Sequence, residues 1–72
     1  MAHVRILYCP VGSGYDERAA SFVAEINGTE HSAEMVSGDS SQFDVFVDDA
    51  LVFSKQREGR WPELIEILAA LA

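Results

Sequence analysis

Cys9 has the most versatile chemistry in this chain, because a cysteine thiolate can attack a disulfide or hold a metal ion. It is the only cysteine among 72 residues, so neither an internal disulfide nor a cysteine-based zinc cluster can form. His3 and His31 could join Cys9 at a metal, but the spacing of the three residues matches no ligand pattern. We therefore expect two half-exposed histidines, no metal and no cofactor.

The neighbours of Cys9 predict where its thiol is placed. Alternating apolar residues predict a strand over 3–8, and apolar residues at helical spacing predict a helix over 15–27. Cys9 would then lie at the carboxyl edge of an α/β sheet, where reactive groups are usually presented. The helix N-terminus favours a thiolate, whereas Asp16 and Glu17 oppose it, so we expect a solvent-reachable thiol with modest activation. A small buried apolar cysteine is the alternative.

The rest of the chain predicts three more strands or strand-like runs and a final helix. We expect a strand over 31–36 and a hairpin over 43–53 that turns at an Asp-containing sequence. The stretch 55–59 reads as a charged connector, and Pro62 fits the first position of the last helix. The apolar stripe of that helix is assigned to Leu64, Ile65, Leu68 and Leu71.

The predicted ends of the first helix depend on small residues. Ser13 is expected to cap its N-terminus, with an acidic residue three positions later. Gly28 is expected to end it in a left-handed conformation.

The element order β-α-β-β-β-α predicts a two-layer α/β sandwich formed by residues 1–72 as a single domain, because 72 residues cannot support two cores. A crossover through the first helix makes the first two strands parallel, and the hairpin extends the sheet in the antiparallel sense. Strand 3–8 is therefore expected inside a mixed four-stranded sheet, with Val4 and Ile6 buried beneath two helices.

The acidic charge of the chain limits the kinds of molecule that it is expected to bind. Twelve acidic against five basic side chains leave a net charge of −7, which repels nucleic acid and anionic membranes. The sequence shows no membrane-spanning run and no secretory leader, so we expect a cytoplasmic protein. A salt-adapted chain and an ordinary acidic one both remain open.

Several motifs resemble those of the selenoprotein W-related family, small redox proteins also called the Rdx group. The matching pieces occur in the family's order over about residues 3–68. They are Tyr8-Cys9, Arg18-Ala19, Phe43-Asp44-Val45, Leu51-Val52-Phe53-Ser54-Lys55 and Gly59-Arg60-Trp61-Pro62-Glu63. The resemblance implies a thioredoxin-like βαβββα fold and a thiol-redox role for the loop after the first strand.

The reactive loop departs from the family motif at its second position. The family carries Cys-x-x-Cys or Cys-x-x-selenocysteine, whereas this chain reads Cys9-Pro10-Val11-Gly12, followed by Ser13. A cysteine in a mixed disulfide needs another thiolate to resolve it, and glycine has none. An intramolecular dithiol cycle is therefore excluded by composition.

Three hypotheses about function follow. The first is a monothiol oxidoreductase-like protein whose Cys9 forms a mixed disulfide or sulfenate, resolved by a low-molecular-weight thiol or a partner protein. The second is a non-catalytic binding module that engages a partner through the Cys9 edge, with Tyr8, or through Trp61. The third is a structural subunit that pairs through its hairpin edge, and we expect a monomer or weak dimer.

Two further groups of residues are expected to be structural. Trp61 is predicted to fasten the last helix to the sheet more readily than to meet a partner. The cations Arg18, Lys55, Arg57 and Arg60 are predicted to pair with nearby carboxylates rather than to form a binding surface.

Monovalent salt is expected to stabilise the fold, because the chain carries a net charge of −7 on 72 residues. The Debye length falls to about 3 Å at 1 M salt, so repulsion between surface carboxylates is screened. The measurement is the thermal midpoint of unfolding between low and molar KCl. A midpoint that stays constant or falls contradicts the prediction.

Overall fold

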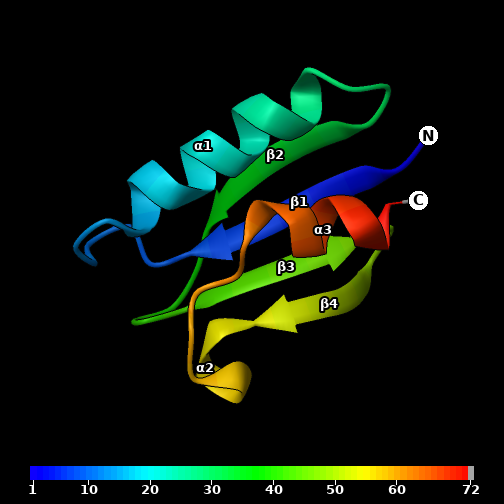
Figure 1. Cartoon of the computed structure of the whole chain (residues 1–72). Coiled ribbons are helices and arrows are strands. Elements are labelled where there is room, and N and C mark those ends of the chain that lie inside the picture. Colours follow the sequence, from blue (N-terminus) through cyan, green and yellow to red (C-terminus); the bar gives the residue numbers. More distant parts are fainter. Residues whose placement is uncertain (72) are drawn as a thin grey trace.

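Residues 1–71 are described by the computed structural model, which contains four strands and three helices (Figure 1). In chain order they are β1 (His3–Tyr8), α1 (Tyr15–Asn27), β2 (Ser32–Ser37), β3 (Phe43–Val47), β4 (Ala50–Ser54), α2 (Lys55–Glu58) and α3 (Leu64–Ala70). None of these helices has the length and apolar character needed to cross a bilayer.

The four strands form one mixed sheet in the order β2-β1-β3-β4. β1 is parallel to β2 and antiparallel to β3, so Ile6 lies between Met35 and Val45. Val4 and Ile6 are fully buried, as expected for the inward face of an interior strand. The prediction that strand 3–8 lies inside the sheet is confirmed.

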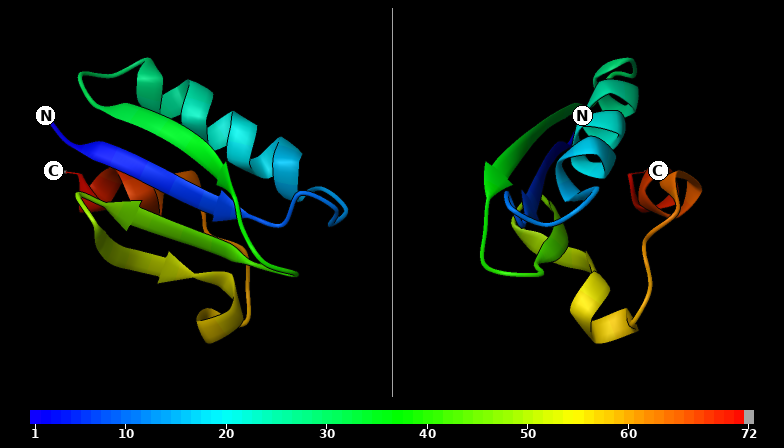
Figure 2. Two further views of the ribbon diagram at one scale, coloured as in Figure 1. Left: turned by 180° about the vertical axis from the view of Figure 1, so that it is seen from behind. Right: turned by 90° about the vertical axis from the view of Figure 1, so that its left-hand side faces the viewer.

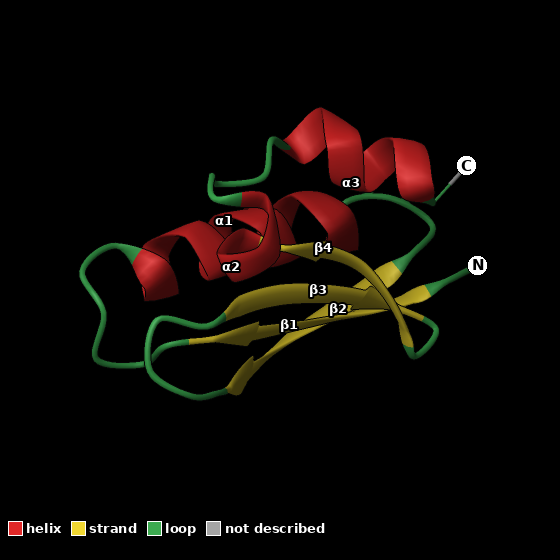
Figure 3. Cartoon of the chain, turned by 90° about the horizontal axis from the view of Figure 1, so that it is seen from below, coloured by secondary structure: helices red, strands yellow, loops and turns green. Residues whose placement is uncertain are grey.

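One face of the sheet carries the core, because α1 and α3 both lie on that side (Figures 2 and 3). Ala19 and Ile26 of α1 are buried, and Phe22 and Val23 pack beside them, which confirms the predicted apolar stripe. The buried hydrophobic cluster consists of Val4, Ile6, Ala19, Ile26, Phe43, Val45, Phe53 and Ile67. The protein is therefore a two-layer sandwich of a mixed four-stranded sheet and helices, as predicted.

The hairpin between β3 and β4 turns at two aspartates. Asp48 and Asp49 have φ values of 48° and 72°, which suit the tight turns that match the twist of paired strands. Short polar side chains tolerate this left-handed conformation better than most. The predicted Asp-containing hairpin is confirmed.

The range of α1 and its end at Gly28 are confirmed, but the predicted N-cap and the left-handed conformation of Gly28 are wrong. Gly14, with φ 78°, occupies the N-cap position, and no side chain there bonds to the first turn. The chain enters the helix through a left-handed residue, which favours glycine over Ser13. At the other end Gly28 stays right-handed, with φ −78°. Thr29 takes part in ending the helix, since its hydroxyl donates to the Ile26 carbonyl at 2.6 Å.

The charged connector contains a third, one-turn helix, α2, that the sequence analysis did not predict. Ser54 caps it by accepting a hydrogen bond from the Arg57 N–H at 3.4 Å. Gly59 ends it with φ 74°, a conformation that glycine adopts without strain. No apolar periodicity marks a single turn, so this helix is specified by its two caps.

The last helix begins two residues later than predicted. Glu63, not Pro62, stands at its start, and Glu63 and Glu66 form a reciprocal capping box. Pro62 is buried ahead of the helix. The apolar stripe also differs, because Ile67 is 1% exposed whereas Ile65 is 72% exposed.

Acid is expected to weaken the anchoring of α3 through Glu66. Hydrogen bonds from the Arg60 guanidinium and from the Glu63 N–H lower the pKa of Glu66 from 4.5 to about 2. Because this pKa is depressed in the folded chain, its stabilising effect is fully present above the unfolded value and disappears as the pH falls towards about 2. Glu66→Gln should therefore lower stability near neutral pH and flatten its decline on acidification.

The measurement is the free energy of unfolding by denaturant from neutral pH down to about pH 2.5. Glu30→Gln, a change of the same charge at an exposed position, serves as the control. Curves for Glu66→Gln that run parallel to those of the unmodified chain would refute the role of this carboxylate.

Candidate functional site

Cys9 directly follows β1, at the carboxyl edge of the sheet where the sequence places it. It is 3% exposed, so the predicted solvent-reachable thiol is wrong. The segment between β2 and β3 folds against this edge: the Cys9 N–H donates to the Gln42 carbonyl at 2.8 Å, and the Gly38 N–H donates to the Tyr8 carbonyl at 2.7 Å. The edge that presents reactive groups in open sheets is thus closed around this thiol.

Gln42 holds the closing segment in place. Its side-chain oxygen accepts from the Asp39 N–H at 2.6 Å, and its amide nitrogen donates to the Asp44 carboxylate at 2.8 Å. The second Asp44 oxygen is buried without a hydrogen-bond partner in the described part of the chain. Sequence reasoning missed Gln42 because the polar stretch 37–42 has no periodicity that marks one residue above the others.

The motif loop is exposed at its tip and closed at its base. Pro10, Val11 and Ser13 are exposed, with Val11 at 89%. Gly12 is half-buried, and its N–H donates to the Cys9 carbonyl at 3.3 Å. The loop therefore turns back tightly on the cysteine.

Gly12 is required by space rather than by backbone conformation. Its φ is not positive, so its backbone accepts an ordinary side chain. A Cβ atom there would nevertheless lie 2.7 Å from Cε1 of Tyr15, closer than carbon atoms pack. The Tyr15 ring occupies the space that a side chain at position 12 would need. Nothing in the residue spacing pointed to Tyr15.

Aromatic packing holds the Tyr15 ring. Trp61 meets it edge-on with ring centroids 4.7 Å apart, and Trp61 also meets Phe43 edge-on at 5.2 Å. Trp61 is half-buried and packs against the core, which agrees with a fastening role. Tyr8, the other aromatic residue predicted as a possible partner contact, is also half-buried against the core.

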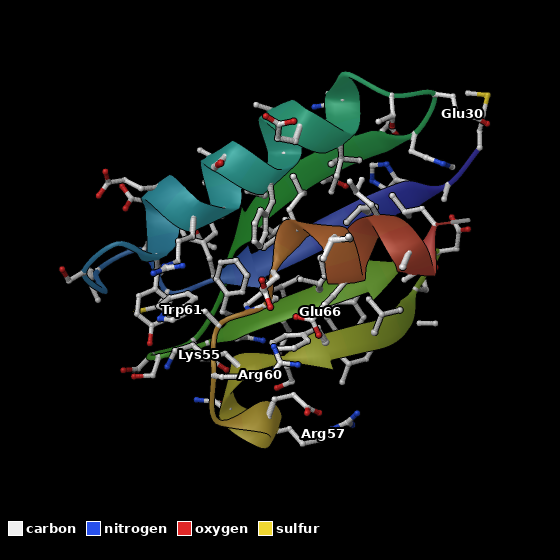
Figure 4. All side chains as sticks on the ribbon, viewed as in Figure 1. Glu30, Lys55, Arg57, Arg60, Trp61 and Glu66 are labelled. Carbon is white, nitrogen blue, oxygen red and sulfur yellow. The ribbon has the colours of Figure 1, made fainter. Side chains whose placement is uncertain are left out.

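The cations around this cluster behave in two ways. Arg57 and Arg60 pair with Glu58 and Glu66 at 4.0 and 2.7 Å, as predicted. Arg18 and Lys55 form no such pair within residues 1–71, so their predicted pairing is wrong. They lie instead 4.3 and 5.0 Å from the centre of the Trp61 ring, and Figure 4 shows Lys55 beside Trp61.

The two histidines lie away from Cys9. His3 begins β1, the strand that Cys9 follows, and its ring nitrogens bond to Ser32 and Glu34 at 2.8 and 2.7 Å. His31 accepts from the Ala2 N–H at 2.8 Å. No cluster of potential metal ligands occurs in the residues the structure describes.

Fold and thiol position together define a small thioredoxin-like protein with one cysteine at the end of its first strand. The Rdx family model matches residues 3–72, and the chain belongs to this family. No curated protein matches the sequence.

Two solved structures share the fold. A selenoprotein W-related protein from Vibrio cholerae superposes with a TM-score of 0.78 at 21% identity, covering 92% of this chain and 86% of that one. A protein from Bordetella parapertussis superposes with a TM-score of 0.81 at 20% identity, covering 97% and 92%.

The contact between Gly12 and Tyr15 predicts a non-additive pair of substitutions. Gly12→Ala should destabilise the fold by about 1–3 kcal/mol, because the new methyl group overlaps the Tyr15 ring. In a Tyr15→Ala background the same change should cost almost nothing, since the ring is gone. The measurement is a double-mutant cycle by denaturant unfolding. Equal costs of Gly12→Ala in both backgrounds would show that Tyr15 does not limit position 12.

Proposed function

We propose that this chain is a thiol-redox protein that acts through Cys9 alone. The observation that carries the proposal is the position of its single thiol, at the carboxyl end of β1 and at the first position of the motif loop. Membership of the Rdx family supports a thiol-redox role of the thioredoxin-like type. Pro10, Val11, Gly12 and Ser13 form the loop that shapes access to the thiol.

The proposed exchange needs no second thiol within the chain, because an external disulfide takes part in the first step and an external thiol in the second. The Cys9 proton passes to solvent, and the thiolate attacks one sulfur of an external disulfide. A bond forms between the Cys9 sulfur and that sulfur, while the external disulfide bond breaks and releases one thiolate. A second external thiolate then attacks the mixed disulfide, forms a new external disulfide and returns Cys9. The external partner is a low-molecular-weight thiol or a client protein.

Access to Cys9 requires a local opening, because the residue is 3% exposed. Segments that are exposed and held by few hydrogen bonds open at lower free energy than the core. The loop tip at Pro10 and Val11 is such a segment. The rate of exchange is then governed by the opening as well as by the thiolate.

The alternative is a binding module that has lost redox chemistry. The observations that favour it are the burial of Cys9 and the Tyr15 ring in the space of a second thiol. In this case Cys9 is a small core residue, and partner binding does not depend on its sulfur.

The folded protein is expected to form a one-to-one adduct with oxidised glutathione, or a Cys9–Cys9 dimer, because no second cysteine can resolve the bond internally. Alkylation of folded Cys9 should be at least about tenfold slower than in the unfolded chain but still measurable, since access needs a local opening. Multiple-turnover disulfide reduction should be poor without an added thiol.

Intact mass after treatment, together with alkylation rates in the folded and unfolded protein, provides the measurement. Cys9→Ser is the control and should give no adduct. A Cys9 that reacts no faster than the whole chain unfolds would overturn the redox proposal and favour the binding module.

A further inference from the structure

Two of the five cations share one indole and form no ion pair with any residue in the range 1–71. Arg18 and Lys55 lie over Trp61, and within residues 1–71 neither forms an ion pair or a side-chain hydrogen bond. Each of the other cations pairs with a carboxylate: Arg5 with Asp49, Arg57 with Glu58 and Arg60 with Glu66. We call Arg18, Trp61 and Lys55 the Trp61 surface.

Within residues 1–71, Arg18 and Lys55 lack a carboxylate partner although the chain is rich in carboxylates. Carboxylates outnumber cations by twelve to five, so partners for cations are plentiful elsewhere. A cation–π contact uses the charge of Arg18 and Lys55 but none of their N–H donors. These donors remain available to an anion, and both cations are held close to the same ring.

We propose that the Trp61 surface docks an acidic segment of a partner protein. A small ligand is disfavoured, because no cavity that could enclose one occurs in the described part of the chain. Nucleic acid is disfavoured as well, since the net charge of −7 repels a polyphosphate along its whole length. One or two carboxylates on a short segment fit two neighbouring cations, and the exposed part of the indole adds apolar contact.

The docking surface is connected to the loop that carries the thiol. Trp61 contacts Tyr15 with ring centroids 4.7 Å apart, and the Tyr15 ring lies against Gly12. Gly12 in turn bonds to the Cys9 carbonyl at 3.3 Å. The acidic segment would belong to the client protein of the proposed thiol exchange. Docking rests on the proposed function only in that the docked partner exchanges a disulfide with Cys9.

Binding is tested in the Cys9→Ser protein, so that no thiol chemistry contributes. The probes are a dye-labelled peptide of alternating Glu and Gly and its counterpart with Gln in place of Glu, read by fluorescence anisotropy at low ionic strength. Trp61 is the only tryptophan, so a change in its emission places the bound peptide at this surface. We expect saturable binding of the Glu peptide alone.

Matched variants separate the surface from net charge. Arg18→Gln and Lys55→Gln should each weaken binding about tenfold, the effect of losing a charged hydrogen bond. Arg57→Gln removes the same charge from α2, which also carries Lys55, and should change binding less than about twofold. Circular dichroism of each variant shows whether it is folded.

Three outcomes would overturn the docking proposal. The first is that Arg57→Gln weakens binding of the Glu peptide as much as Arg18→Gln or Lys55→Gln does. The second is that the Glu and Gln peptides bind with equal affinity. The third is that a single-stranded oligonucleotide binds more tightly than the Glu peptide. Failure of the redox proposal can be distinguished from failure of the docking proposal. If Cys9 is inert, peptide binding is unchanged. If the peptide does not bind, adduct formation with oxidised glutathione is still expected.

Discussion

Edge-to-face packing around Phe43 is the interaction on which the rest of this structure depends. Phe43 is fully buried on β3, with Phe22 of α1 at 6.0 Å and Trp61 at 5.2 Å between ring centroids. One cluster thus joins the sheet, the first helix and the segment that leads into α3. Both α1 and α3 lie on one face of the sheet, and the hydrophobic core of the described residues is on that face, so a failure of this packing is not compensated elsewhere.

The same cluster shapes the thiol loop. Tyr15 packs on Trp61 and in doing so fills the space beside Gly12. Aromatic packing therefore occupies the space that a side chain at position 12 would need. At the same edge the Gln42 carbonyl accepts a hydrogen bond from the Cys9 N–H, and Cys9 is buried. In the proposed function, a reaction of Cys9 with an external disulfide therefore requires this edge to open.

Local and global electrostatics differ in sign at Trp61. The chain as a whole is acidic, but Arg18 and Lys55 form a small positive area on one indole. At physiological ionic strength charges separated by more than about 8 Å are largely screened, so a partner in contact meets the local charge. In the proposed docking, the net charge of the chain governs which molecules approach, and Arg18 and Lys55 govern which segment is bound.

The sequence alone determined the strand order, the range of α1, the Asp hairpin and the placement of Cys9 at a sheet edge. It also excluded an intramolecular dithiol cycle, because the chain contains a single cysteine. Periodicity specifies these features locally: alternation marks strands, and apolar residues three and four apart mark a helix face. The sequence did not predict the single-turn helix α2 or the true start of α3, because their caps involve individual hydrogen bonds rather than a repeating pattern.

Only the tertiary structure decided what surrounds the thiol. The Cys9 N–H donates to the carbonyl of Gln42, which is distant in sequence and lies in a stretch without periodicity. Trp61 receives Arg18 from α1 and Lys55 from α2, although both cations have carboxylates nearer in sequence. Such contacts depend on which elements are neighbours in the folded chain, and residue spacing along the sequence does not predict them.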